Sequence, residues 1–130
     1  MKRSILLIAQ EAFMQEALGD ILDSVGLHPI LTGEAQTGID EFRAQQNDIE
    51  AVVLDVGLFN SDDFSVVDKL IHINPSVRVL VSTSYDEREL SRRYTGNIPF
   101  PVLYKPYSAQ AFVSTLMNVL ENGRHTDKIA

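Results

Sequence analysis

Side chains that could do chemistry follow four separate apolar stretches of this 130-residue sequence. They are a carboxylate, a hydroxyl, an ammonium group and an amide next to a second carboxylate: Asp55, Thr83, Lys105 and Gln10-Glu11. An ionised carboxylate beside so much apolar sequence needs a cationic partner, and Lys105 is the obvious candidate for Asp55. Together these groups suit a phosphate pocket. A structural ion pair or a loop-starting aspartate explains Asp55 as well, and Thr83 suits an ordinary strand-end hydroxyl.

The apolar stretches themselves are short and continuous, which is typical of strands buried on both faces of a parallel sheet. A weaker strand at 28–32 suits a sheet edge, because Pro29 cannot donate to a ladder. The four stronger strands are expected at residues 5–9, 51–56, 77–82 and 101–104.

Between the strands, apolar residues recur with helical spacing and predict four amphipathic helices. A fifth, weaker helix is expected at 86–94. Gly26 stands where a helix C-cap glycine belongs, and Ser108 stands where an N-cap belongs. The four apolar stripes are Phe13, Ala17, Ile21, Leu22 and Val25; Ala35, Gly38, Ile39 and Phe42; Phe64, Val67 and Ile71; and Phe112, Leu116, Val119 and Leu120.

Strand and helix alternate five times, which predicts an α/β protein with a doubly wound, five-stranded parallel sheet and helices on both faces. We expect the strand order 2-1-3-4-5, with the ligand site beyond the carboxyl ends of the strands, where the candidate residues stand. The length suits one domain, placed at residues 1–122, followed by a loose tail at 123–130.

Composition excludes several kinds of protein. The absence of cysteine removes disulfides, thiolate metal sites and cysteine nucleophiles, and the three histidines lack the paired spacing of a metal site. The net charge of −7 argues against a nucleic-acid partner. Arg88, Arg92 and Arg93 are interleaved with glutamates, which indicates a solvated helix face. The longest apolar stretch is too short to span a membrane, so we expect a cytoplasmic protein.

Other proteins with this alternation need loops that the sequence lacks. A nicotinamide or nucleotide site places glycines after the first strand, and residues 9–14 contain none. A flavin loop rich in Ser, Thr and Gly is absent there too. A phosphatase of the haloacid-dehalogenase kind usually carries a second aspartate where this sequence has Gly57. With no cofactor loop and no catalytic dyad, we do not expect an independent metabolic enzyme.

From about Lys2 to Asn122 the sequence resembles a response-regulator receiver domain, whose fold is flavodoxin-like. The resemblance is carried by ILLIAQEAFMQEALGDIL, VVLDV, VLVSTS and LYKPYS, in this order and spacing. It implies that Asp55 attacks a phosphoryl group on a histidine of a partner kinase or phosphotransfer protein and forms an aspartyl phosphate. It further implies that Lys105 supplies positive charge, that Thr83 donates a hydrogen bond to a phosphoryl oxygen, and that the Lys105–Pro106 bond is cis.

The sequence departs from the receiver pattern at the metal site. Receivers have two adjacent acidic residues after the first strand, where this sequence has Ala9 and Gln10. Magnesium prefers oxygen ligands, commonly one or two carboxylates with waters and phosphate oxygens. The ligands that the resemblance leaves are Asp55, the backbone carbonyl of Gly57, and Glu11 or Gln10. If Mg²⁺ binds, its site therefore carries fewer carboxylates than that of a typical receiver.

Two more departures concern the switch between states. Residues 59–63 replace the turn with proline and glycine that usually follows the acceptor. Val102 stands three residues before Lys105, where receivers often carry an aromatic side chain that swings inward. Tyr104 and Tyr107 flank Lys105 instead, and suit either ordinary packing or a substitute switch role.

Two functions remain open on the sequence. The first is a phosphoacceptor receiver that takes phosphate on Asp55 and changes a protein-interaction face. The second is a pseudo-receiver, the same fold kept as a protein-binding or dimerising module without phosphorylation. The expected partners are a histidine kinase or phosphotransfer protein, with an effector domain or a second copy of the chain as further candidates.

Overall fold

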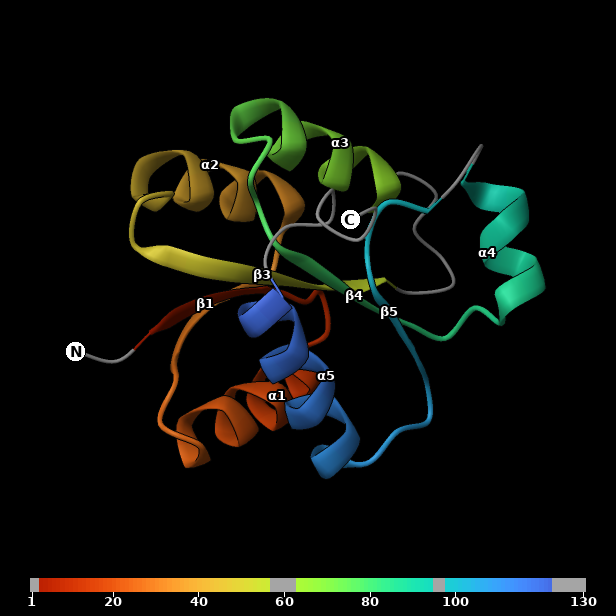
Figure 1. Ribbon diagram of the computed structural model, residues 1–130, viewed down its shortest axis with the longest axis horizontal. Coiled ribbons are helices and arrows are strands. Elements are labelled where there is room, and N and C mark those ends of the chain that lie inside the picture. The colour runs from red at the N-terminus through yellow and green to blue at the C-terminus, as the bar shows by residue number, and fades with distance from the viewer. Residues whose placement is uncertain (1–2, 57–62, 95–97, 123–130) are drawn as a thin grey trace.

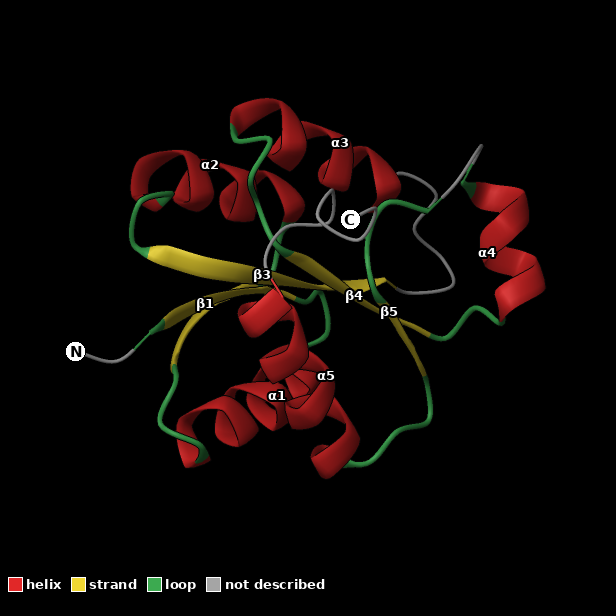
Figure 2. Cartoon of the chain, viewed as in Figure 1, coloured by secondary structure: helices red, strands yellow, loops and turns green. Residues whose placement is uncertain are grey.

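The structure is a computed structural model that describes residues 3–56, 63–94 and 98–122. Five parallel strands form one sheet in the order β2-β1-β3-β4-β5, with helices on both sides (Figures 1 and 2). The predicted class and strand order are confirmed. The strands are β1 (Ser4–Ile8), β2 (His28–Thr32), β3 (Ile49–Val56), β4 (Val79–Thr83) and β5 (Val102–Tyr104). The helices are α1 (Ala12–Ser24), α2 (Ala35–Gln45), α3 (Asp63–Ile73), α4 (Glu87–Arg93) and α5 (Ala109–Asn122).

The sheet separates two apolar layers. Figure 1 shows α2 and α3 on one face, α1 and α5 on the other, and α4 at the side near β5. Residues that alternate along each strand point to opposite layers, as the pleat of a strand requires. On β3, for example, Val52 and Leu54 join the α2/α3 layer, whereas Ala51 and Val53 join the α1/α5 layer. Both faces are covered, which explains the continuous apolar stretches of the sequence.

Helix α1 buries only part of the predicted stripe. Phe13 is 70% exposed and Val25 is 40% exposed, although both were expected to face the core. Leu22, which belongs to the predicted stripe, is fully buried, and Leu18 and Met14 complete the buried face at spacings of four residues. The prediction for Phe13 and Val25 is therefore wrong, because several apolar phases fit this helix and only packing against the sheet selects one.

The predicted ends of two helices are confirmed. Gly26, just after α1, has a φ of +83°, a left-handed conformation that favours glycine, and its N–H donates to the Asp23 carbonyl. The Ser108 hydroxyl accepts a 3.0 Å hydrogen bond from the Ala111 N–H at the start of α5. Asp86 caps α4 in the same way through the Glu89 N–H, so the predicted helix at 86–94 is one residue shorter at each end.

No helix in the described ranges is long and apolar enough to cross a membrane.

Candidate functional site

Asp55 lies one residue before the end of β3, at the edge of the sheet where the candidate residues were expected to meet. Its side chain is only 3% exposed, and its Oδ1 lies 2.8 Å from Nζ of Lys105, which follows β5. The expected contact between Lys105 and Asp55 is confirmed. The peptide bond between Lys105 and Pro106 is cis, as the resemblance implies. This pair satisfies the need of a buried carboxylate for a cation.

The hydroxyl that reaches Asp55 belongs to Ser82, which is not among the predicted site residues. Ser82 Oγ donates a 3.0 Å hydrogen bond to Asp55 Oδ1 and is fully buried. Ser82 pairs directly with Asp55 in the register between β3 and β4. Because side chains alternate along a strand, the residue opposite Asp55 shares its face of the sheet, and the next residue does not. Once the register of β3 against β4 is known, that alternation points to Ser82 rather than Thr83.

Thr83 ends β4 and is fully buried. Its Oγ1 accepts a 3.0 Å hydrogen bond from the Tyr85 N–H, within the turn that leads towards α4. The structure thus brings Asp55, Ser82 and Lys105 together and places the Thr83 hydroxyl in the adjoining turn. The role of Thr83 towards a phosphoryl group remains a prediction.

A hollow of about 160 Å³ opens beside Asp55. Gln10 lines this hollow, in agreement with its expected position near the acceptor. Glu11 is exposed at the start of α1 and is not among the lining residues. Glu34 lines the hollow from the loop between β2 and α2. Glu34 was not among the predicted site residues, and it follows β2, the strand that the sequence indicates only weakly.

The described residues do not fit the magnesium site that the resemblance implies. Ala9 is buried and has no side-chain oxygen, and Gln10 offers only a neutral one. Oδ1 of Asp55 is already held by an ammonium group and a hydroxyl. Across the described ranges, no group of three or more Asp, Glu or His side chains is arranged to hold a metal. Gly57, the remaining expected ligand, lies outside the described residues.

Tyr107 extends the hydrogen bonds around Asp55. Its hydroxyl lies 2.6 Å from Ser82 Oγ, and its ring stacks on Phe112 of α5 with centroids 6.1 Å apart. Burial raises the pKa of the Tyr107 phenol above its usual value, the hydrogen bond between Tyr107 and Ser82 opposes this shift, and the charge of Asp55 adds to it. The phenol therefore keeps its proton throughout the neutral pH range and can donate a hydrogen bond.

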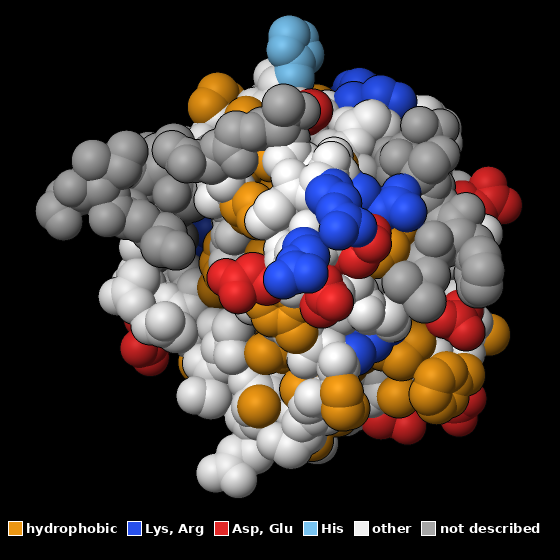
Figure 3. All heavy atoms as spheres, turned by 90° about the vertical axis from the view of Figure 1, so that its right-hand side faces the viewer, with side chains coloured by type: hydrophobic (Ala, Val, Ile, Leu, Met, Phe, Trp, Pro, Cys, Tyr) orange, Lys and Arg blue, Asp and Glu red, His pale blue; other side chains and the backbone are white. Residues whose placement is uncertain are grey.

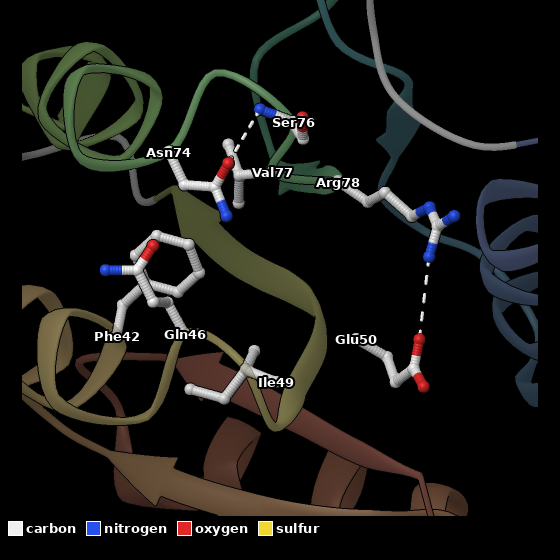
Figure 4. A pocket seen from close by; sticks show the side chains of 8 residues that line it. All are labelled: Phe42, Gln46, Ile49, Glu50, Asn74, Ser76, Val77 and Arg78. Atoms are coloured by element: carbon white, nitrogen blue, oxygen red, sulfur yellow. Dashed lines mark hydrogen bonds and ion pairs between the residues drawn. The ribbon is translucent and has the colours of Figure 1, made fainter.

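A second hollow, of about 370 Å³, lies at the opposite end of β3 and β4 (Figure 4). Arg78 and Glu50 form its polar rim, with 3.5 Å between the guanidinium and carboxylate atoms, and Phe42 lies at its apolar side. Asn74 Oδ1 accepts a hydrogen bond from the Ser76 N–H there. Because Ile49 begins β3, this hollow is at the amino ends of the strands, away from Asp55.

Two of the basic residues of α4, Arg92 and Arg93, are paired with an acidic one. Glu89 lies 3.1 Å from Arg92 and 3.6 Å from Arg93. Figure 3 shows blue and red side chains side by side on this face of the molecule. The geometry agrees with a solvated helix face, where charges of opposite sign neutralise one another.

Two curated proteins resemble nearly the whole of this chain at low sequence identity. No protein-family model matches the chain. It is 25% identical over 119 residues to a cyclic di-GMP phosphodiesterase of Thermotoga maritima, covering 92% of this chain and 31% of that protein. It is 23% identical over 124 residues to the uncharacterized transcriptional regulatory protein YesN of Bacillus subtilis, covering 95% and 34%. The chain thus spans about a third of the length of these curated relatives.

Solved structures establish the class of the fold. A response-regulator receiver domain protein from Clostridium thermocellum superimposes with a TM-score of 0.75 at 21% identity, covering 91% of this chain and 94% of that one. A receiver protein from Sinorhizobium medicae gives a TM-score of 0.76 at 18% identity, covering 92% and 95%. The chain has the fold of a response-regulator receiver domain.

Proposed function

We propose that this domain is a two-component signalling receiver that accepts a phosphoryl group on Asp55 from a phosphohistidine of a partner protein. The observation that carries the proposal is the buried Asp55–Lys105 pair, 2.8 Å apart, beside a hollow of about 160 Å³ at the carboxyl edge of the sheet. Such an edge is where doubly wound proteins bind ligands. Lys105 is 21% exposed, so its ammonium group can face an entering phosphoryl group as well as Asp55.

The two oxygens of Asp55 have different surroundings. Lys105 and Ser82 both contact Oδ1, and Oδ2 accepts no hydrogen bond from the described residues. Oδ2 is therefore the proposed nucleophile. It forms a bond to phosphorus while the phosphorus–nitrogen bond to the partner's histidine breaks, and the electron pair of that bond leaves with the nitrogen. Lys105 then offsets part of the charge that the phosphoryl oxygens bring to the pocket.

The test is intact-mass spectrometry of the protein incubated with acetyl phosphate, with and without magnesium. We expect a single phosphoryl addition, lost in Asp55→Asn, at a rate that depends little on magnesium, because Ala9 and Gln10 replace the acidic pair of receivers. The exposed carboxylate variant Asp20→Asn is the matched control and should react like the parent. No addition to the parent, or an addition that persists in Asp55→Asn, would overturn the proposal.

The second candidate is the pseudo-receiver, and the poor fit to magnesium is the observation that favours it. In that case the Asp55–Lys105 pair is structural, and the domain acts by binding an effector domain or a second copy of the chain. The pseudo-receiver, unlike the phosphoacceptor, predicts that partner binding or self-association is unchanged in Asp55→Asn. Analytical ultracentrifugation of the parent and the variant measures this.

A further inference from the structure

Three side chains from three elements form one hydrogen-bonded chain that ends on Asp55. Tyr107, in the loop between β5 and α5, reaches Ser82 on β4, and Ser82 reaches Asp55 on β3. The distances are 2.6 Å and 3.0 Å. Tyr107, one of the two tyrosines that suit a substitute switch role, is therefore connected to the acceptor.

Chemistry fixes which group donates and which accepts in each of these two hydrogen bonds. An ionised carboxylate can only accept hydrogen bonds, so the single proton of the Ser82 hydroxyl is used towards Asp55. Ser82 Oγ then has only lone pairs to offer, and Tyr107 must donate to it. The raised pKa of the Tyr107 phenol keeps that proton in place. The order of donation is Tyr107 to Ser82 to Asp55.

The strength of these two hydrogen bonds depends on the charge of Asp55. Hydrogen bonds to an ionised acceptor are about twice as strong as neutral ones. When Oδ2 becomes bonded to phosphorus, Oδ1 becomes the carbonyl oxygen of an acyl phosphate and loses its share of the negative charge. The bond from Ser82 then weakens, and the hold of Ser82 and Asp55 on the Tyr107 hydroxyl weakens with it.

Tyr107 is also placed to transmit the change. Its ring stacks on Phe112, which is fully buried in the first turns of α5. Tyr107 packs against the α1/α5 layer, whereas Val102, at the position of the usual aromatic, packs against the α2/α3 layer. The two positions therefore belong to different faces of the sheet.

We propose that Tyr107, acting through Ser82, reads the charge state of Asp55 and passes it to the first turns of α5. The proposal rests on the proposed function for its trigger, since phosphorylation is what removes the charge. Tyr107 is a positioning residue in this scheme, because it touches neither the reacting atoms nor the phosphoryl group.

The test uses the full chain with ¹³C at the Cζ atoms of its four tyrosines, assigned by single Tyr→Phe variants. Asp55→Asn removes the charge without any phosphorylation. We expect it to shift the Tyr107 resonance more than that of Tyr104, which lies on the other side of Lys105 and is the internal control. In a Ser82→Ala background the same change should lose most of its effect on Tyr107, because the connecting hydroxyl is gone.

A second experiment remains informative if the Ser82→Ala variant folds poorly. Tyr107→Phe removes only the hydroxyl and keeps the ring on Phe112. In this variant, Asp55→Asn should no longer shift the backbone amides of residues 109–112, although it does so in the parent. Tyr104→Phe, the same chemical change in the exposed neighbour, should leave those shifts as in the parent.

The outcomes separate the two proposals. Three results would overturn the proposal that Tyr107 responds to the charge on Asp55 through Ser82. The Tyr107 resonance does not shift, it shifts only as much as that of Tyr104, or its shift survives in Ser82→Ala. If the expected shifts are found but acetyl phosphate never modifies Asp55, the proposed function fails and the connection from Asp55 to α5 stands. If Asp55 is modified, the phosphorylated protein should show the Tyr107 shift of Asp55→Asn.

Discussion

At the scale of single residues, one cation and one hydroxyl hold the charge on Asp55 among the residues that the structure describes. Lys105→Met keeps the apolar stem and removes the cation. Because Asp55 is 3% exposed and Lys105 21%, we expect the unfolding free energy to fall by about 2 kcal/mol, less than for a fully buried pair. Urea unfolding measures the loss. Adding Asp55→Asn should recover most of it, and a double variant as unstable as the sum of the singles would contradict the pairing.

A second prediction at this scale concerns the missing acidic pair. Ala9→Asp with Gln10→Asp adds two carboxylates beside Asp55, and Ala9 is fully buried. Without a cation the double variant should be at least about 2 kcal/mol less stable than the parent, because a like charge is crowded and desolvated. Magnesium at a hundred times its dissociation constant should return about 2.7 kcal/mol. Melting temperatures across a magnesium titration decide this, and a parent that shifts as much as the variant would show that its own donors suffice.

At the scale of elements, α2 lies so close to β1 that a side chain at one of its positions would force a neighbour to shift. A Cβ atom at Gly38 would lie 2.6 Å from two carbon atoms of Ile8 and 3.1 Å from Thr32 Oγ1. Gly38→Ala should destabilise the protein by about 1–3 kcal/mol, although alanine favours a helix by about 1 kcal/mol over glycine. Thr37→Ala, at the exposed neighbouring position, is the control and should change stability by less than about 0.5 kcal/mol.

Strand β5 gives a second prediction at this scale. Val102 is half-buried in the α2/α3 layer, and a branched side chain has few rotamers to exchange. On addition of a phosphate mimic we expect small chemical-shift changes at Val102 and Tyr104 and larger ones at Thr83. Two-dimensional NMR of the labelled protein measures all three. Shifts at Val102 as large as those at Thr83 would mean that β5 moves as in aromatic-bearing receivers.

At the scale of the whole molecule, stability should decline at alkaline pH. Burial raises the pKa of Tyr107 above its ordinary value of 10.0, so the folded state keeps a proton that the unfolded chain loses. This contribution is fully present below pH 10 and is lost as the pH rises through the folded pKa. Urea unfolding at about pH 9 and about pH 11 should therefore show a smaller decline in Tyr107→Phe than in the parent. Equal declines in the two proteins would contradict the assignment.

The sequence by itself determined the order of strands and helices, the fold class and the chain position of Asp55 and Lys105. These follow from patterns within a few neighbouring residues, where burial on both faces and helical spacing leave direct traces. The pairing of Asp55 with Lys105 was also predictable, because a carboxylate at the end of a buried strand requires a cation.

Only the tertiary structure decided which hydroxyl meets Asp55, which face of α1 is buried, and that Glu34 and Tyr107 adjoin the site. The choice of Ser82 over Thr83 depends on the register of β3 against β4, and a shift of one residue exchanges the two faces. Phe13 lost its expected burial because the sheet accepts one apolar phase of α1 and leaves the others in solvent. Loops place Glu34 and Tyr107, and a loop's path is set by the packing of the elements that it joins, which no local pattern records.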